Sequence, residues 1–200
     1  GAAPEYVDKA LYDFGMAMGP NAVGDLAGLD VGYKTRVERE DKPDDPRFYR
    51  IADVLVEMGR YGQKTGKGTY LYEGGSRKPI PDPEVAEIIK AESDRLGIEH
   101  RDISEQESIE RCVYGLVVEG ARILEEGIAS RSSDIDVVWM NGYGFPRYRG
   151  GPMHYADTIG LQNVYATVCE FEERFGSTYW SPPALLKELA ESGRTFKDVT

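Results

Sequence analysis

The chain has 200 residues, enough for one domain or two small ones with an apolar core, and a formal net charge of −11 at pH 7. This charge would repel nucleic acid and anionic membranes, so we expect neither as a partner. Two cysteines and two histidines argue against a disulfide framework and a zinc site, and we expect no metal. Without an apolar run long enough to cross a bilayer or a secretory leader pattern, we expect a cytoplasmic protein.

Apolar periodicity predicts a nearly all-α fold, because almost no segment shows the period-two alternation of a strand. Capping residues, glycines and prolines set the expected limits of the helices. We expect helices over 4–16, from Asp25 to about Val37, from about Pro46 to Gly59, over 83–96, from Ser104 to Gly127, from Ser133, from Asp157 through Phe175, and from Pro183 to about Ser192.

A window rich in Gly and Pro, 59–83, interrupts this periodicity and predicts a long ordered loop or linker in which 69–72 can be extended. The window is locally basic, with few carboxylates to balance Arg60, Lys64, Lys67, Arg77 and Lys78. A basic island in an acidic chain can meet phosphates. A solvated loop explains the same charges and is the favoured interpretation.

One motif occurs twice without a gap, G-P-x-x-x-x-D-x-x-G-L, at 19–29 and again at 151–161. Two distant copies indicate duplication of a helical half-domain rather than a solenoid. We therefore expect two related helical half-domains that pack together and are joined by the window at 59–83. We interpret the repeated aspartates, Asp25 and Asp157, as helix N-caps, because capping explains both copies at once whereas catalysis would need two sites.

Motifs of catalytic chemistry are absent from the sequence. No G-x-G-x-x-G follows a strand, and no G-x-S-x-G, H-E-x-x-H or C-x-x-C occurs. The glycine cluster 59–68 fails as a P-loop, since Gly68 stands where Ser or Thr would hold magnesium. His154 lies inside the second motif copy but has no histidine counterpart in the first, which favours packing or capping over catalysis.

Several segments resemble the C-terminal domain of 3-hydroxyacyl-CoA dehydrogenases, and they cover nearly the whole chain. They are Asp8-Lys9-Ala10-Leu11, the run from Phe14 to Pro20, the run from Gln63 to Tyr70, and Gly142-Tyr143-Gly144-Phe145-Pro146 followed by Arg149-Gly150-Gly151-Pro152. The tandem pair is similar to the multifunctional enzymes of fatty-acid β-oxidation. The resemblance implies a fold like the C-terminal domain of 6-phosphogluconate dehydrogenase. It also implies a truncated first unit over 1–58, a linker with a helix over 59–103, and a complete second unit over 104–200.

In this family NAD and the catalytic residues belong to a Rossmann domain, which the resemblance places upstream together with a hydratase domain. It implies that this chain holds no catalytic residue, binds no cofactor itself and is inactive alone, while the full-length enzyme uses NAD and an acyl-CoA substrate. The resemblance also implies substrate contact at Asn141, just before the Gly-x-Gly-Phe-Pro turn, and we add Tyr143 within the turn as a second candidate. From the residues alone, Asn141 can equally end a helix and Tyr143 can equally belong to the core.

An alternative function is a helical interaction module that has the same fold and binds protein rather than acyl-CoA. The truncated first unit leaves the helix from Val7 to Phe14 without its partner face. We therefore expect exposed apolar surface on this helix, through which the chain can self-associate.

Overall fold

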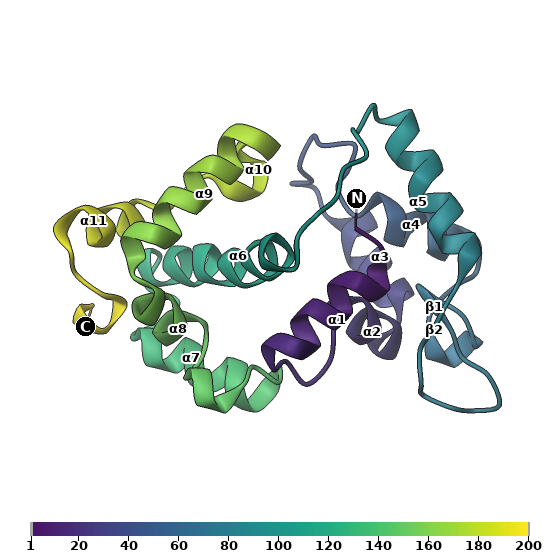
Figure 1. Cartoon of the computed structure of the whole chain (residues 1–200), viewed down its shortest axis with the longest axis horizontal. Helices are drawn as coiled ribbons and strands as arrows, with labels where there is room; N and C mark the ends of the chain where they lie inside the picture. Colours follow the sequence, from purple (N-terminus) through teal and green to yellow (C-terminus); the bar gives the residue numbers. More distant parts are fainter. Residues whose placement is uncertain (1, 200) are drawn as a thin grey trace. The chain divides into compact units, whose positions relative to one another are not determined.

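The computed structural model describes residues 2–199 and is mostly helical (Figure 1). In the described part of the chain the single sheet is antiparallel and pairs β1 (Tyr70–Leu71) with β2 (Ile80–Pro81). Tyr70 lies opposite Pro81 and Leu71 opposite Ile80. The prediction of an all-α fold is confirmed, and the extended segment falls inside the predicted 69–72.

The chain divides into two compact units. Unit 1 comprises the residues up to Tyr12 together with Met18–Glu105, and unit 2 comprises Asp13–Ala17 and the chain from Gln106 onward. The end of the first helix and the residues after it therefore belong to unit 2, although the rest of that helix belongs to unit 1. The three-part division at 59 and 104 stays a prediction.

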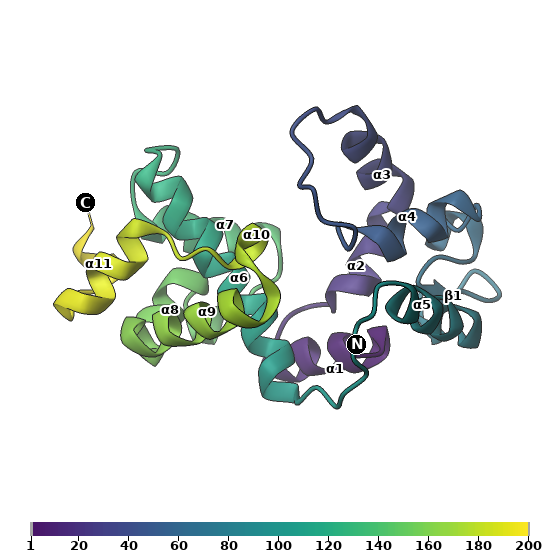
Figure 2. The same cartoon turned by 90° about the horizontal axis from the view of Figure 1, so that it is seen from above.

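Unit 1 is built from short helices followed by the β1–β2 hairpin and a longer helix. Within it α3 packs on α4, and α4 packs on α5 (Figure 2). The elements are α1 (Pro4–Phe14), α2 (Pro20–Ala27), α3 (Leu29–Glu38), α4 (Arg50–Glu57), the 3-10 turn η1 (Gln63–Thr65) and α5 (Pro83–Arg95). Proline opens α1, α2 and α5, where its missing N–H group costs no helical hydrogen bond.

The apolar stripe of α1 is buried. Ala10, Leu11 and Phe14 are each less than 5% exposed, Val7 is half-buried, and the exposed large hydrophobic side chains of α1 are Tyr6 and Tyr12. The exposed apolar surface expected on the helix from Val7 to Phe14 is therefore limited to Tyr12 and part of Val7, because the helical spacing buries Ala10, Leu11 and Phe14. Self-association through α1 stays a prediction.

Unit 2 is built around the long helix α6 (Glu105–Glu125), whose buried residues include Val113, Val117 and Ala121. The other elements are α7 (Ser132–Gly142), the 3-10 turn η2 (Arg147–Arg149), α8 (Pro152–Ile159), α9 (Leu161–Phe175), α10 (Ser177–Trp180), α11 (Ala184–Ser192) and η3 (Phe196–Asp198). Helix α8 packs on α7, α9 and η3.

Two predicted helices are in fact divided in two. The helix expected from Asp25 to Val37 is α2 and α3, separated by Gly28, and the helix expected from Asp157 is α8 and α9, separated by Gly160. These glycines are the same position of the repeated motif, and both have a positive φ, of 97° and 94°. A glycine in this conformation ends a helix, so the motif encodes a helix start at its Gly-Pro and a helix break at its last glycine.

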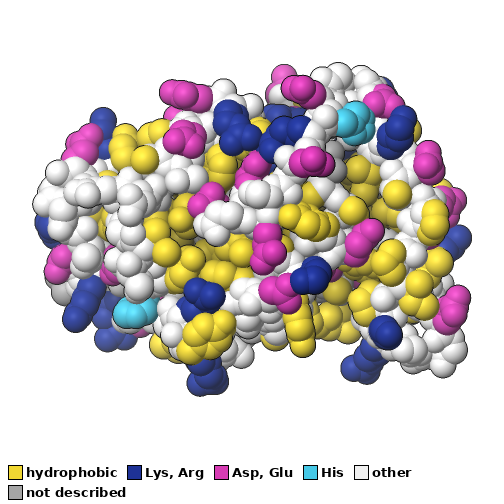
Figure 3. Space-filling view, viewed as in Figure 1, with side chains coloured by type: hydrophobic (Ala, Val, Ile, Leu, Met, Phe, Trp, Pro, Cys, Tyr) yellow, Lys and Arg dark blue, Asp and Glu magenta, His cyan; other side chains and the backbone are white. Residues whose placement is uncertain are grey.

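The surface mixes side chains of every kind. Figure 3 shows hydrophobic side chains reaching the surface across the viewed face, with acidic and basic side chains among them. The most exposed large hydrophobic side chains of the chain include Ile128 and Tyr148. No helix of the described residues is long and apolar enough to cross a membrane.

Candidate functional site

The two predicted site residues lie where α7 ends. Asn141 is in the last turn of α7, Tyr143 follows the helix directly, and both side chains are exposed. Each has its own partner: Asn141 is hydrogen-bonded to Arg147, and the Tyr143 ring packs against Trp139 with the ring centroids 4.9 Å apart. The structure thus places both residues on one turn, and it does not put Tyr143 in the core, since its ring is 63% exposed.

The amide of Asn141 is held at both ends. Its Nδ2 donates to the carbonyl oxygen of Val137 at 2.8 Å, and its Oδ1 accepts from Nη2 of Arg147 at 2.7 Å. The chemistry of the partners fixes this orientation, because a guanidinium only donates and a carbonyl only accepts. One N–H of the amide is left facing away from both partners on an exposed side chain.

The turn after α7 is anchored on the segment Asp13–Ala17. The backbone N–H of Ala17 donates to the carbonyl oxygen of Gly144 at 3.0 Å. Gly144 has a φ of +72°, and a Cβ added to it would lie 2.6 Å from the Cβ of Ala17. Only glycine fits this position, since it needs both the left-handed backbone and the missing side chain. This explains the second glycine of the Gly-x-Gly-Phe-Pro segment.

The next residues of the turn bind the end of α1. The hydroxyl of Tyr148 and Nε of Arg149 both donate to the carbonyl oxygen of Phe14, at 2.9 and 3.0 Å. The Arg149 guanidinium lies 4.0 Å from the centroid of the Phe14 ring, and this ring meets Phe145 and Tyr155 edge to face. A cation and two donors at the last carbonyl of a helix are favourable both to its unpaired acceptor and to its dipole.

These roles were not predicted from the sequence. Arg149 belongs to a segment that resembles the family, 149–152. Nothing in the sequence around it indicates that it binds the end of a helix more than a hundred residues earlier. In the structure Arg149 is half-buried, and its Nε donates a hydrogen bond to the carbonyl oxygen of Phe14.

Two aspartates, the buried Asp136 and the half-buried Asp157, bind backbone N–H groups of other segments of unit 2. Asp136 of α7 accepts from the backbone N–H groups of Met153 at 2.8 Å and His154 at 3.1 Å, at the start of α8. Burial raises the pKa of Asp136 to about 6, although both hydrogen bonds and His154 act to lower it. Asp157 accepts from the N–H groups of Phe196 and Lys197, and burial raises its pKa as well.

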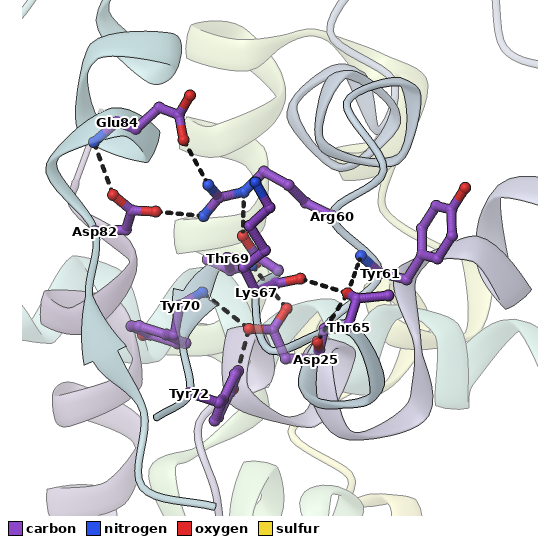
Figure 4. Close-up of polar contacts among 12 residues, drawn as sticks. Asp25, Arg60, Tyr61, Thr65, Lys67, Thr69, Tyr70, Tyr72, Asp82 and Glu84 are labelled. Atoms are coloured by element: carbon purple, nitrogen blue, oxygen red, sulfur yellow. Dashed lines mark hydrogen bonds and ion pairs between the residues drawn. The ribbon is translucent and has the colours of Figure 1, made fainter. Parts of the chain in front are cut away.

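The prediction that Asp25 and Asp157 are N-caps of their own helices is wrong. Both lie inside short helices, and each binds backbone N–H groups of a segment far along the chain. For Asp25 these are the N–H groups of Thr69 and Tyr70, at 2.8 and 2.9 Å (Figure 4). The capping role falls to other aspartates, Asp8 and Asp136, each of which lies in the helix before the one it caps.

Two of the five cations of the basic island at 59–83, Arg60 and Lys64, are paired with carboxylates. Arg60 is fully buried and donates to Asp82 at 2.5 Å, to Glu84 at 2.7 Å and to the carbonyl oxygen of Gly68 at 2.9 Å (Figure 4). Lys64 forms an ion pair with Asp30. These two cations are therefore structural, which supports the favoured interpretation of this window over phosphate binding.

One cavity of about 150 Å³ lies in unit 1, between the start of α1, the end of β2 and the start of α5. It is lined by Pro4, Glu5, Thr69, Pro81, Asp82, Pro83, Val85 and Ala86. Pockets for ligands of drug size are roughly 300–1,000 Å³, so we do not assign this cavity to an acyl-CoA.

The described residues also offer nothing that fits a dinucleotide or a metal. A dinucleotide fold needs a parallel sheet with a glycine-rich turn leading into a helix, whereas residues 2–199 form only the β1–β2 hairpin. Residues 2–199 contain no group of three or more His, Cys, Asp or Glu placed to hold a metal ion.

Comparison with known proteins identifies the family. The model of the family described as "3-hydroxyacyl-CoA dehydrogenase, C-terminal domain" matches residues 1–72 and 108–198, and each segment contains one copy of the repeated motif. The chain belongs to this family. The two matched segments are thus related to one another, as the repeat predicts.

Relatives of this family include large multifunctional proteins. The chain is 42% identical to the peroxisomal bifunctional enzyme of Danio rerio over 96% of its own length and 29% of that protein. It is 36% identical to the fatty acid oxidation complex subunit alpha of Pseudomonas savastanoi, over 95% of the chain and 26% of that protein. The chain therefore spans less than a third of each of these relatives.

Solved structures agree with this assignment. The dehydrogenase part of multifunctional enzyme 1 from C. elegans superposes with a TM-score of 0.73 at 32% identity, over 94% of this chain and 42% of that one. The 3-hydroxybutyryl-CoA dehydrogenase of Escherichia coli superposes with a TM-score of 0.66 at 21% identity, over 96% and 56% of the two chains. The second comparison supports the fold alone.

Proposed function

We propose that this chain is the substrate-side part of an NAD-dependent 3-hydroxyacyl-CoA dehydrogenase within a multifunctional polypeptide of fatty-acid β-oxidation. The observation that carries the proposal is the tandem match of the dehydrogenase C-terminal domain to both halves of one chain, an arrangement that also relates it to the multifunctional relatives. NAD would exchange hydride with the 3-carbon of the substrate in a separate upstream domain, since the described residues do not fit a dinucleotide.

The chain itself would bind and orient the acyl-CoA. Asn141 and Tyr143 are the proposed contacts, because both are exposed side chains on a turn that is fixed by three hydrogen bonds to Asp13–Ala17. The amide offers a free N–H donor, and the tyrosine offers a flat apolar ring with a hydroxyl. A fixed turn orients such groups at little entropic cost, which is what substrate positioning requires.

The location in the cytoplasm and the absence of membrane and nucleic-acid partners stay predictions. Relatives whose names give a compartment are peroxisomal proteins. The upstream Rossmann and hydratase domains are proposed as the partners of this chain in the whole protein.

The test is NADH oxidation with acetoacetyl-CoA, measured for the chain alone and for the chain mixed with the NAD-binding segment encoded upstream. We expect no activity from the chain alone and activity on mixing, because cofactor and substrate surfaces then meet. Activity from the chain alone would contradict the absence of catalytic residues. A lack of activity in both cases, with a folded NAD-binding segment, would favour the interaction module.

A further inference from the structure

In the hydrogen bond between Arg147 and Asn141 the arginine is the donor, and this decides which atoms of the Asn141 amide remain available to a ligand. Arg147 Nη2 holds the amide oxygen at 2.7 Å, and the carbonyl of Val137 holds one amide hydrogen. If Arg147 were absent, the carbonyl of Val137 would still hold one amide hydrogen, but the amide oxygen would lose its donor and could accept a hydrogen bond from a ligand. With Arg147 in place, the amide presents an N–H donor.

Arg147 can hold the amide because its own backbone is fixed. It opens the η2 turn, and the two residues that follow it, Tyr148 and Arg149, are both bound to the carbonyl oxygen of Phe14. The Arg149 guanidinium also lies over the Phe14 ring. A long side chain that starts from an anchored turn loses less conformational freedom when it makes its hydrogen bond.

The charge of Arg147 is not balanced by a carboxylate. Many arginines of the chain pair with carboxylates, as Arg36 does with Asp53 and Arg131 with Asp134, whereas Arg149 binds the carbonyl oxygen of Phe14. Within residues 2–199, Arg147 makes its hydrogen bond to a neutral amide, and no carboxylate lies within ion-pair distance of it. A cation bonded to the amide oxygen draws electrons from the amide and makes the remaining N–H a stronger donor.

We propose that Arg147 is a positioning residue, which orients and polarises the amide of Asn141 so that it donates a hydrogen bond to an oxygen of the acyl thioester substrate. This inference rests on the proposed function, in which Asn141 contacts the substrate. It adds that Asn141 acts as a donor and that Arg147 determines this role.

The test uses the dehydrogenase assay with the chain joined to its NAD-binding part, and four variants. N141A should lower kcat/KM by roughly tenfold, the loss of one hydrogen bond made to a polarised group. R147Q should lower it by a similar factor, and R147K should restore most of the activity because a lysine ammonium also donates to Oδ1. N141D should lower kcat/KM at least as much as N141A does. Aspartate can still pair with Arg147, but its carboxylate has no N–H to donate to the substrate.

The decisive comparison is the double variant N141A/R147Q. If Arg147 acts through Asn141, the double variant has the same kcat/KM as N141A alone. Further loss of activity in the double variant, or normal activity of R147Q beside an impaired N141A, overturns the inference. The matched control is R131Q, which removes an exposed arginine at the start of α7 and should leave activity unchanged.

A second measurement separates this inference from the proposed function. The two side-chain amide protons of Asn141 give distinct ¹⁵N-correlated NMR signals, and R147Q should shift them strongly whereas R131Q should not. If N141A retains full activity, the proposed contact between Asn141 and substrate fails. The NMR measurement still decides whether Arg147 orients the amide in that case. If the Asn141 amide signals do not shift in R147Q, Arg147 does not orient the amide.

Discussion

Asp8 and Asp136 each lie in a helix that precedes one copy of the repeated motif, and each carboxylate binds the backbone N–H groups of the third and fourth residues of that copy. Asp8 accepts from Asn21 and Ala22, both at 2.9 Å, and Asp136 accepts from Met153 and His154. The first N–H groups of a helix lack partners within it, so each aspartate satisfies two of them. The hydrogen bonds that the two copies share therefore anchor a helix in each copy, and the two aspartates do not form a catalytic pair.

The two anchors differ in their side-chain partners, since Asp8 also accepts from the side-chain amide of Asn21 at 2.9 Å. Asp8 also accepts a hydrogen bond from the hydroxyl of Tyr70 at 2.9 Å, whereas Asp136 has no such hydroxyl among its described partners. The groups of α8 that act on Asp136 are His154, which lowers its pKa, and Asp157, which raises it. From η3, Asp198 raises the pKa of Asp157 in turn.

The first prediction concerns pH. Burial raises the pKa of Asp136 from its ordinary value of 3.8 to about 6, so the folded chain binds this proton more tightly than the unfolded chain. Its contribution to the free energy of unfolding is then fully present below about pH 4 and is lost as the pH rises through about 6. We expect the free energy of unfolding of the wild-type chain, relative to D136N, to fall between pH 4 and pH 6.5.

Urea denaturation of both proteins across this range measures the difference, and subtraction removes other groups that titrate there. D134N is the control, because Asp134 is an exposed carboxylate of the same helix whose pKa is lowered by Arg131. A constant difference between wild type and D136N from pH 4 to pH 6.5 would contradict the raised pKa.

The second prediction concerns the buried arginine of unit 1. R60M removes the cation but leaves Asp82, whose side chain is 8% exposed, without its charged partner. Breaking a buried ion pair in this way costs about 3 kcal/mol, because the remaining carboxylate stays desolvated. The change in the free energy of unfolding is measured by urea denaturation.

The control for R60M is R77M, in the same basic window but on an exposed loop. Surface substitutions of this kind change stability by less than about 0.5 kcal/mol. Equal urea midpoints for the two variants would show that the Arg60 cluster does not stabilise unit 1.

The third prediction compares two glycines of the proposed site. G144A forces alanine into a left-handed conformation and against Ala17, and we expect a loss of about 2 kcal/mol of stability. G142A lies two residues earlier, where an added Cβ meets nothing within 4 Å. It should leave stability unchanged or raise it by up to ~1 kcal/mol. Thermal denaturation of both variants tests this, and a G144A variant as stable as G142A would refute the tight packing of the turn.

The sequence alone determined the all-α class, the existence of two related copies and most helix limits. These follow from local features: the spacing of apolar side chains, the prolines at helix starts and the glycines at helix ends. The helix α5, for example, was expected over 83–96 and lies at Pro83–Arg95. The family followed from short segments such as Gly142–Pro146, which the match over both copies confirms.

Only the tertiary structure decided what the polar residues of these segments do. The aspartates of the motif were expected to cap their own helices, yet Asp25 binds Tyr70 and Asp157 binds Phe196, because a buried or half-buried carboxylate accepts from whichever unpaired N–H groups the fold brings to it. In the same way, no local pattern reveals that Arg149 binds the carbonyl of Phe14. Sequence periodicity reports which face of a helix is apolar, but partners far apart along the chain are chosen by packing.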